Sequence, residues 1–173
     1  MSGLKVQPKP RHPATAGSGL LFLREEQMRL AQDLMFFAYR DFTAAADVIL
    51  TELGMGRAHH RTLHFIGRNP EMTVGDLLAI LRITKQSLAR VLNDLVNRGY
   101  VAQSTGREDR RQRLLSLTSD GYLLEKRLYE RQHERLAAAY REAGGQAVEG
   151  FRQVMRAIMD PAARTYTDLN GHP

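Results

Sequence analysis

Polar side chains suited to reading DNA open a predicted helix in the middle of the sequence. They occupy its start and the position one turn later: Thr84, Lys85, Gln86, Ser87 and Arg90. Glutamine can form two hydrogen bonds with adenine, and arginine or lysine can do so with guanine. The free backbone amides at a helix start also favour phosphate. The alternative interpretation is an ordinary amphipathic helix with a hydrated polar face.

A second cationic group falls in a polar loop between two predicted strands. Four arginines lie close together there: Arg107, Arg110, Arg111 and Arg113. A loop tip is narrow enough to enter the minor groove of DNA, where the negative potential of A·T-rich tracts attracts arginine. Asp109 stands two residues before Arg111, and a carboxylate at that spacing can hold the guanidinium in a fixed direction. The alternative is a solvated charged turn.

The positive charge of the chain is concentrated in two segments. The 173 residues carry 25 Lys and Arg against 19 Asp and Glu, a formal net charge of +6. Residues 84–113 hold seven basic and three acidic residues, and residues 1–19 hold three basic residues and no acid, so the remainder is close to neutral. A concentrated basic patch favours a polyanionic partner.

Absent residues and segments argue against several functions. Because the chain has no cysteine, it has no disulfide, thiolate catalysis, Cys-ligated zinc or thiol redox switch. The sequence has no cleft pattern of paired carboxylates, no glycine-rich phosphate loop and no activated nucleophile, so we do not expect an enzyme. No apolar stretch suits a signal peptide or a transmembrane helix, so we expect a cytoplasmic protein with no membrane partner.

His60 and His64 are the pair that most suggests a metal site. They stand four residues apart and share a helical face, but the sequence H-R-T-L-H lacks the glutamate of H-E-x-x-H. No third ligand is evident nearby, and zinc sites use three or four protein ligands. We therefore expect neither a metal nor another cofactor.

Hydrophobic periodicity predicts helices at both ends of the chain and a compact series of short elements between them. Apolar residues at three- and four-residue steps predict helices, and a period of two predicts strands. The predicted helices cover residues 23–53, 57–68, 74–81, 84–97, 119–143 and 148–159, and the predicted strands cover 100–104 and 112–117. Capping residues and stops bound them: Thr73 with Asp76, Thr84 and Thr118 at the starts, and Gly54, Gly99 and Gly144 at the ends. Residues 162–173 are expected to be frayed.

This order predicts a mainly α fold with a small β-hairpin wing, that is, a winged helix-turn-helix. The outer helices carry apolar stripes that so small a cluster cannot cover, and the natural partner is a second copy of the chain. We therefore divide the chain into a disordered basic arm, two dimerisation segments and a DNA-binding domain. The arm covers 1–22, the dimerisation helices cover 23–53 and 121–173, and the winged helix-turn-helix covers 54–120.

Two segments carry a resemblance to a known family. They are LLAILRITKQSLARVLNDLVNRGYV (77–101) and GREDRRQRLLSLTSDG (106–121), the second with a D-x-R wing and an L-T-x-x-G helix start. The chain resembles the MarR family of bacterial transcription regulators over roughly 140 residues. Its segment LREEQMRLAQDLMFFAYRDFTAAADVIL (23–50), with GMGRAHH (54–60), looks most like the alphaproteobacterial branch that includes PetP and LdtR-type regulators. The resemblance implies a homodimer on an inverted-repeat operator, with recognition helix 84–97 in the major groove and wing 105–112 in the minor groove. Arg111 is then the arginine that enters the minor groove, and Asp109 is its orienting partner.

The resemblance also implies a small aromatic or phenolic effector, bound in a cleft between the dimer helices and the winged domain. The residues that would line it come from the first two predicted helices: Phe36, Tyr39, Arg40, Thr43, His60, Leu63 and His64. The alternative is that these side chains only pack the junction between the two domains. Gly75 departs from the family pattern, which often has a larger residue there, and the lack of cysteine excludes the peroxide-sensing branch.

Two functional hypotheses remain at this point. The first is a ligand-responsive dimeric regulator that binds a specific double-stranded DNA operator, and the second is an architectural protein that binds DNA without sequence preference. The polar groups suited to base edges on helix 84–97 favour the first, because the wing alone would suffice for non-specific binding.

Overall fold

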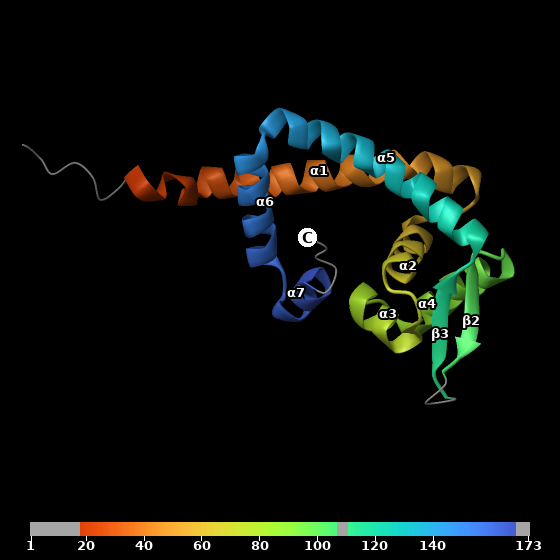
Figure 1. Cartoon of the computed structure of the whole chain (residues 1–173). Helices are drawn as coiled ribbons and strands as arrows, with labels where there is room; N and C mark the ends of the chain where they lie inside the picture. The colour runs from red at the N-terminus through yellow and green to blue at the C-terminus, as the bar shows by residue number, and fades with distance from the viewer. Residues whose placement is uncertain (1–17, 107–110, 169–173) are drawn as a thin grey trace, which may run out of the picture. The chain divides into compact units, whose positions relative to one another are not determined.

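The structure is a computed structural model that describes residues 18–106 and 111–168 of the chain. It divides into two compact units, residues 1–40 and residues 41–173. The first unit holds a 3₁₀ helix, η1 (Ser18–Leu23), and the first part of α1 (Glu25–Glu52). The second unit begins within α1 and holds every other described element (Figure 1).

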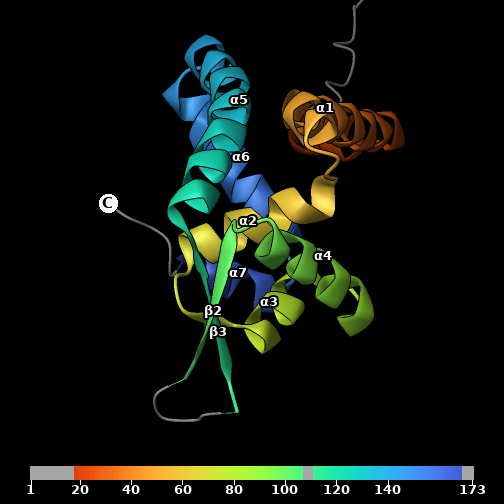
Figure 2. The same cartoon turned by 90° about the vertical axis from the view of Figure 1, so that its right-hand side faces the viewer.

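Three short helices and a three-stranded antiparallel sheet form the centre of the second unit. The helices are α2 (Arg57–Arg68), α3 (Val74–Leu81) and α4 (Lys85–Asn97), and the strands are β1 (Met72–Thr73), β2 (Val101–Thr105) and β3 (Arg113–Leu117). The strand order is β1-β3-β2. Figure 2 shows the β2–β3 ribbon projecting beyond α3 and α4. The predicted winged helix-turn-helix is confirmed.

One hydrophobic core holds these elements together. Leu63 and Ile66 of α2, Leu77 of α3, Leu95 of α4 and Leu115 of β3 are all fully buried. Two longer helices complete the core with one face each: α1 contributes Ala46, Ile49 and Leu50, and α5 (Ser119–Ala143) contributes Leu124 and Leu128. The core therefore fixes α4 and the β2–β3 ribbon to the same rigid body.

The capping residues act as the sequence predicts. The Thr73 hydroxyl accepts from the Asp76 amide at 3.1 Å while the Asp76 carboxylate accepts from the Thr73 amide at 3.0 Å. Thr118 caps α5 by accepting from the Gly121 amide at 3.0 Å. Gly54 and Gly99 follow α1 and α4 with positive φ angles of 63° and 77°, which glycine adopts without a steric penalty.

Three features differ from the sequence prediction. Residues 18–22, predicted within the disordered arm, belong to η1, whose sequence SGLLFL is apolar. Strand β1 was missed because two residues are too few to show a period of two; it pairs Met72 with Leu115 and Thr73 with Leu114. The segment predicted to be frayed holds a further helix, α7 (Pro161–Asp168), which follows α6 (Gly145–Ile158).

Helix α7 begins with a helix-start signal that the sequence contains. The Asp160 carboxylate accepts from the Ala162 amide at 2.9 Å, and Pro161 occupies the first helical position. Aspartate before the first turn and proline at its first residue are both typical of helix starts. The sequence prediction is wrong here because it takes Asp160-Pro161 only as the end of the preceding helix, whereas the same two residues also start α7.

Long apolar side chains remain exposed on α5 and α6. Tyr122, Leu123 and Tyr129 of α5 and Phe151, Val154 and Ile158 of α6 are each about half exposed or more. Within the described residues, no helix is long and apolar enough to cross a membrane.

Candidate nucleic-acid interface

Helix α4 is held in place by its apolar face. Leu88, Leu92 and Leu95 are almost completely buried, and Val91 is nearly so. These positions recur at three- and four-residue steps, and Val96 packs partly against the same core, so the opposite side of α4 faces away from the core. The face that holds the candidate DNA contacts is therefore fixed by packing.

The candidate contacts lie together at the exposed start of α4. Thr84 is its N-cap: the Thr84 hydroxyl accepts from the Ser87 amide at 3.1 Å and donates to the Ser87 hydroxyl at 2.8 Å. Lys85, Gln86 and Arg90 are exposed, and Gln86 and Arg90 share one side of the helix. Thr84 and Ser87 therefore order the first turn, while the three longer side chains extend from it.

A polar cluster that the sequence analysis missed anchors the other end of α4. Arg98 lies 2.9 Å from the Asp94 carboxylate and donates to the Leu53 carbonyl at 2.7 Å. His59 of α2 accepts from the Gly56 amide through Nδ1 at 3.1 Å, so its proton is on Nε2, 3.2 Å from Asp94. The i, i+4 spacing of Asp94 and Arg98 was visible in the sequence, but the contacts to α2 and Leu53 required the fold.

The wing is built by strands β2 and β3. Their register pairs Val101 with Leu117 and Thr105 with Arg113. Beyond the last pair, the Gly106 amide donates to the Gln112 carbonyl at 3.0 Å, which continues the ribbon toward its tip. Arg111 and Arg113 are exposed on the returning arm. Arg107, Asp109 and Arg110 lie outside the described residues, so the predicted orientation of Arg111 by Asp109 stays a prediction.

The residues predicted to bind an effector are divided between the two compact units. Phe36, Tyr39 and Arg40 belong to the first unit, and the rings of Phe36 and Tyr39 are more than half exposed. Thr43, His60 and His64 belong to the second unit and are partly buried. Leu63 is a fully buried core residue.

His60 and His64 face acidic side chains of the second unit. His64 Nδ1 lies 3.5 Å from the Glu125 carboxylate of α5. Burial lowers the pKa of His60 below its usual value of 6.5, and the neighbouring His64 lowers it further, against the opposing attraction of Glu125 and Asp47. Among the described residues, no three His, Asp or Glu side chains form a group that could hold a metal ion.

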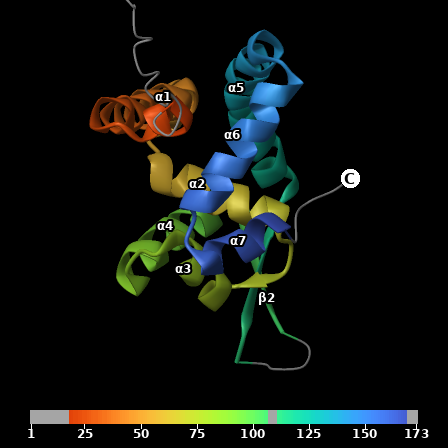
Figure 3. The same cartoon turned by 90° about the vertical axis from the view of Figure 1, so that its left-hand side faces the viewer.

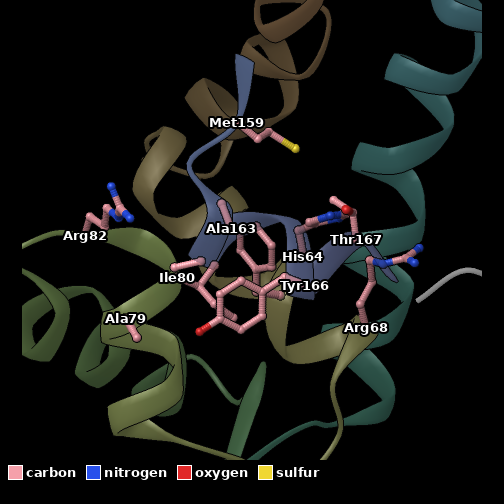
Figure 4. Close-up of a pocket in the computed structure, with 11 residues that line it drawn as sticks. His64, Arg68, Ala79, Ile80, Arg82, Met159, Ala163, Tyr166 and Thr167 are labelled. Atoms are coloured by element: carbon pink, nitrogen blue, oxygen red, sulfur yellow. The ribbon is translucent and has the colours of Figure 1, made fainter. Parts of the chain in front are cut away.

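A cavity of about 630 Å³ lies between α2, α3 and the segment that contains α7 (Figure 4). Of the predicted effector-binding residues, His64 alone lines it. The other lining residues come from α2 (Phe65, Arg68), from α3 and its C-cap (Ala79, Ile80, Arg82) and from the C-terminal segment (Met159, Ala162, Ala163, Tyr166, Thr167). Figure 3 shows α7 beside α2 and α3. No sequence pattern indicates this cavity, because α7, which supplies four of its lining residues, is not among the predicted helices.

Solved structures share this fold at low sequence identity. A MarR variant from E. coli complexed with operator DNA is 20% identical, with a TM-score of 0.60, and the match covers 81% of this chain and 99% of that one. NadR in complex with 4-hydroxyphenylacetate is also 20% identical, with a TM-score of 0.63, and the match covers 88% of this chain and 97% of that one. These likenesses support the fold.

Sequence comparison gives the family. A model described as the MarR family matches residues 53–112. The HTH-type transcriptional regulator PetP of Rhodobacter capsulatus is 54% identical over 156 residues, which cover 90% of this chain and 94% of that protein. These relatives are transcription regulators and not enzymes, as the sequence predicts. The chain therefore belongs to the MarR family of winged helix-turn-helix transcription regulators, and the PetP branch that its first helix suggests matches as well.

Proposed function

We propose that the protein is a dimeric regulator that binds a specific DNA operator arranged as an inverted repeat. In this proposal, helix α4 occupies the major groove and residues 105–112 of the wing occupy the minor groove. The observation that carries it is the start of α4, where Lys85, Gln86 and Arg90 are exposed while the opposite face of the helix is buried. This arrangement presents base-reading side chains on a fixed support.

The relation between helix and wing supports simultaneous contact with both grooves. Both elements belong to the same core, since Leu95 of α4 and Leu115 of β3 are each fully buried in it. The anchor formed by Arg98, Asp94 and the Leu53 carbonyl further restricts α4. A DNA-binding surface that is rigid before binding loses less conformational entropy when it binds.

A second copy of the chain is the proposed partner for the exposed apolar faces of α5 and α6. Phe151, Val154 and Ile158 of α6 expose between 47% and 60% of their surface, and monomeric proteins rarely expose contiguous apolar patches of large area. A two-fold dimer would present two copies of α4, which matches the symmetry of an inverted repeat.

Two structural relatives were solved with ligands that suggest the partners of this chain. The MarR variant was solved with operator DNA, and NadR was solved with 4-hydroxyphenylacetate. We propose the same two classes of partner here: double-stranded operator DNA, and a small aromatic or phenolic effector whose binding changes DNA affinity. The effector site predicted from the sequence, from Phe36 to His64, remains a proposal.

Competition binding tests the proposal against non-specific DNA binding. A labelled operator, isolated by repeated selection of genomic fragments on the full-length protein, is competed with bulk genomic DNA. We expect the operator to bind at least about a thousandfold more tightly. A ratio near one would leave the architectural function as the better account.

A substitution at Gln86 tests whether the preference for the operator depends on this side chain. The Gln86→Ala variant should lose roughly 1–3 kcal/mol of operator binding and relax the preference at one base position, because Gln86 would form base-edge hydrogen bonds. Its affinity for bulk DNA should change little, since phosphate contacts dominate non-specific binding. An unchanged base preference in Gln86→Ala would remove this residue from the reading surface.

A further inference from the structure

The anchor at the end of α4 is closed on the loop between α1 and α2 from both sides. The Leu53 carbonyl, at the start of that loop, accepts from Arg98 Nη1 at 2.7 Å. Arg98 Nε lies 2.9 Å from Asp94 Oδ2, and the same oxygen lies 3.2 Å from His59 Nε2. His59 Nδ1 accepts from the Gly56 amide, at the end of the loop, at 3.1 Å. The end of α4 is therefore held by both ends of the α1–α2 loop.

The loop that holds α4 is itself fixed to α1. The Met55 amide donates to the Leu50 carbonyl at 2.7 Å, and the Met55 side chain is buried. Arg57, the first residue of α2, lies 2.7 Å from the Asp47 carboxylate of α1. The anchor therefore connects the end of α4 to the end of α1, and not only to the loop.

The anchor is directional, whereas the apolar packing of α4 is not. Leu88 and Leu95 hold α4 against the core by hydrophobic contact, which has no preferred direction. A hydrogen bond to a carbonyl oxygen requires a narrow range of distance and angle. The Arg98 guanidinium meets two such requirements at once, because different nitrogens contact Asp94 and the Leu53 carbonyl. The anchor therefore limits the tilt of α4 more narrowly than packing alone.

We propose that Arg98 is a positioning residue that determines which spacing of half-sites the dimer accepts. This inference rests on the proposed function, in which two copies of α4 bind an inverted repeat. In a two-fold dimer, the separation of the two copies depends on how each α4 is held relative to α1, a predicted dimerisation helix. One added base pair moves a half-site by about 3.4 Å and turns it by roughly 35° about the DNA axis. Firmly held α4 helices discriminate against such an operator, and α4 helices that can tilt do not.

The anchor should matter more for this geometry than for the stability of the fold. The side chains of Arg98 and Asp94 are 38% and 37% exposed. Ion pairs at such exposed positions contribute little to stability. A substitution at Arg98 should therefore change the spacing preference while the urea midpoint stays close to that of the wild type.

Titration of operator duplexes with altered spacing tests the proposal. The selected operator is prepared with its natural spacing and with one base pair inserted or removed between the half-sites. The full-length wild type should prefer the natural spacing at least about tenfold, because the DNA or the dimer must deform to bind the altered duplexes. In Arg98→Lys the preference should fall below about threefold, because a compact ammonium group cannot reproduce the two directions of the guanidinium.

The matched control makes the same exchange outside the anchor. Arg61→Lys lies on an exposed position of α2 and should keep the wild-type spacing preference. Both variants retain their positive charge, so their attraction to phosphate should be unchanged. A base change within one half-site should weaken the wild type and Arg98→Lys equally, because Arg98 positions α4 and does not contact the bases.

A second variant tests the anchor from α2. His59 is the third residue of α2, where glutamine can still accept from the Gly56 amide, as in a capping box. Glutamine lacks the rigid ring that reaches Asp94 at the same time. His59→Gln should therefore lower the spacing preference, but by less than Arg98→Lys does, because Arg98 keeps both of its contacts.

The outcomes separate this proposal from the proposed function. The wild-type spacing preference in either anchor variant would overturn the proposal, and so would an equal loss of affinity for all three duplexes. A selective wild-type protein that binds the three spacings equally would overturn it as well. A wild type that binds the natural operator no more tightly than bulk DNA would instead contradict the proposed function.

Discussion

Arg111 lies on the returning arm of the wing with an exposed side chain. An arginine gains most in the narrow, negative minor groove of A·T-rich DNA. We therefore expect Arg111→Ala to weaken binding to operators with A·T-rich flanks much more than to operators with G·C-rich flanks, measured by titration of both duplexes. An equal loss on the two duplexes would show that Arg111 does not act in the minor groove.

The burial of His60 predicts how the stability of the protein depends on pH. Burial lowers the pKa of His60, so the unfolded chain binds the proton more readily than the folded protein. Stability is therefore greatest above pH 6.5 and decreases as the pH falls through the lowered pKa. Urea midpoints at pH 7.5 and pH 5.5 should differ less in His60→Gln than in the wild type. His64, Asp47 and Glu125 face the same region, and all three are retained in His60→Gln, so an unchanged pH dependence in that variant would exclude His60 as its source.

Individual capping residues were predictable because their signals are local. Thr73, Thr84 and Thr118 each form the predicted bond with an amide three residues later. The Arg98 contact with the Leu53 carbonyl joins residues 45 positions apart, and no local pattern encodes such a pairing. The sequence therefore identified the exposed groups on α4 but not the contacts that orient the helix.

Two glycines near helix starts differ in the space around them: one has room for a Cβ atom and the other does not. A Cβ at Gly75 in α3 would meet the Thr73 hydroxyl at 3.5 Å, an ordinary contact, whereas a Cβ at Gly121 in α5 would lie 1.9 Å from the Tyr100 carbonyl oxygen. That carbonyl also accepts from the Thr118 amide at 3.1 Å. The glycine of the L-T-x-x-G motif therefore lets the start of α5 approach the backbone of Tyr100, which lies between α4 and β2.

Alanine at these two positions should change stability in opposite directions. Gly75→Ala should stabilise the protein by about 0.5–1 kcal/mol, because alanine favours helix and restricts the unfolded chain. Gly121→Ala should destabilise it by about 3 kcal/mol, because the Tyr100 backbone must move. Urea unfolding of both variants measures the difference, and a Gly121→Ala protein as stable as the wild type would contradict the close approach.

Elements were predictable in proportion to their length and to the strength of their boundary signals. Helix α2 begins and ends at the predicted residues, and β3 starts within one residue of the prediction. Strand β1 is too short to carry a pattern, and its pairing with β3 depends on the fold. Helix α7 had a signal in Asp160-Pro161, but its packing beside α2 and α3 creates a cavity that no periodicity indicates.

At the scale of the whole molecule, the exposed apolar residues of α6 predict self-association. Val154 lies on the apolar stripe of α6 and is 59% exposed. Val154→Asp should weaken the dimer, because a buried unpaired carboxylate is costly, and light scattering coupled to size exclusion would detect monomer. The control is Gln153→Asp, on an exposed polar position of the same helix, which should remain dimeric. A wild-type protein that is monomeric at micromolar concentration would contradict the proposed dimer.

Specific operator recognition by two copies of α4 is the central claim, and the DNA recovered with the protein tests it most directly. Genomic fragments are bound by the full-length protein, trimmed by nuclease and sequenced. The protected fragments should share an inverted repeat whose half-sites lie about one helical turn apart, roughly 10 base pairs centre to centre. Protected fragments with no shared sequence, or with a single unpaired half-site, would contradict this account.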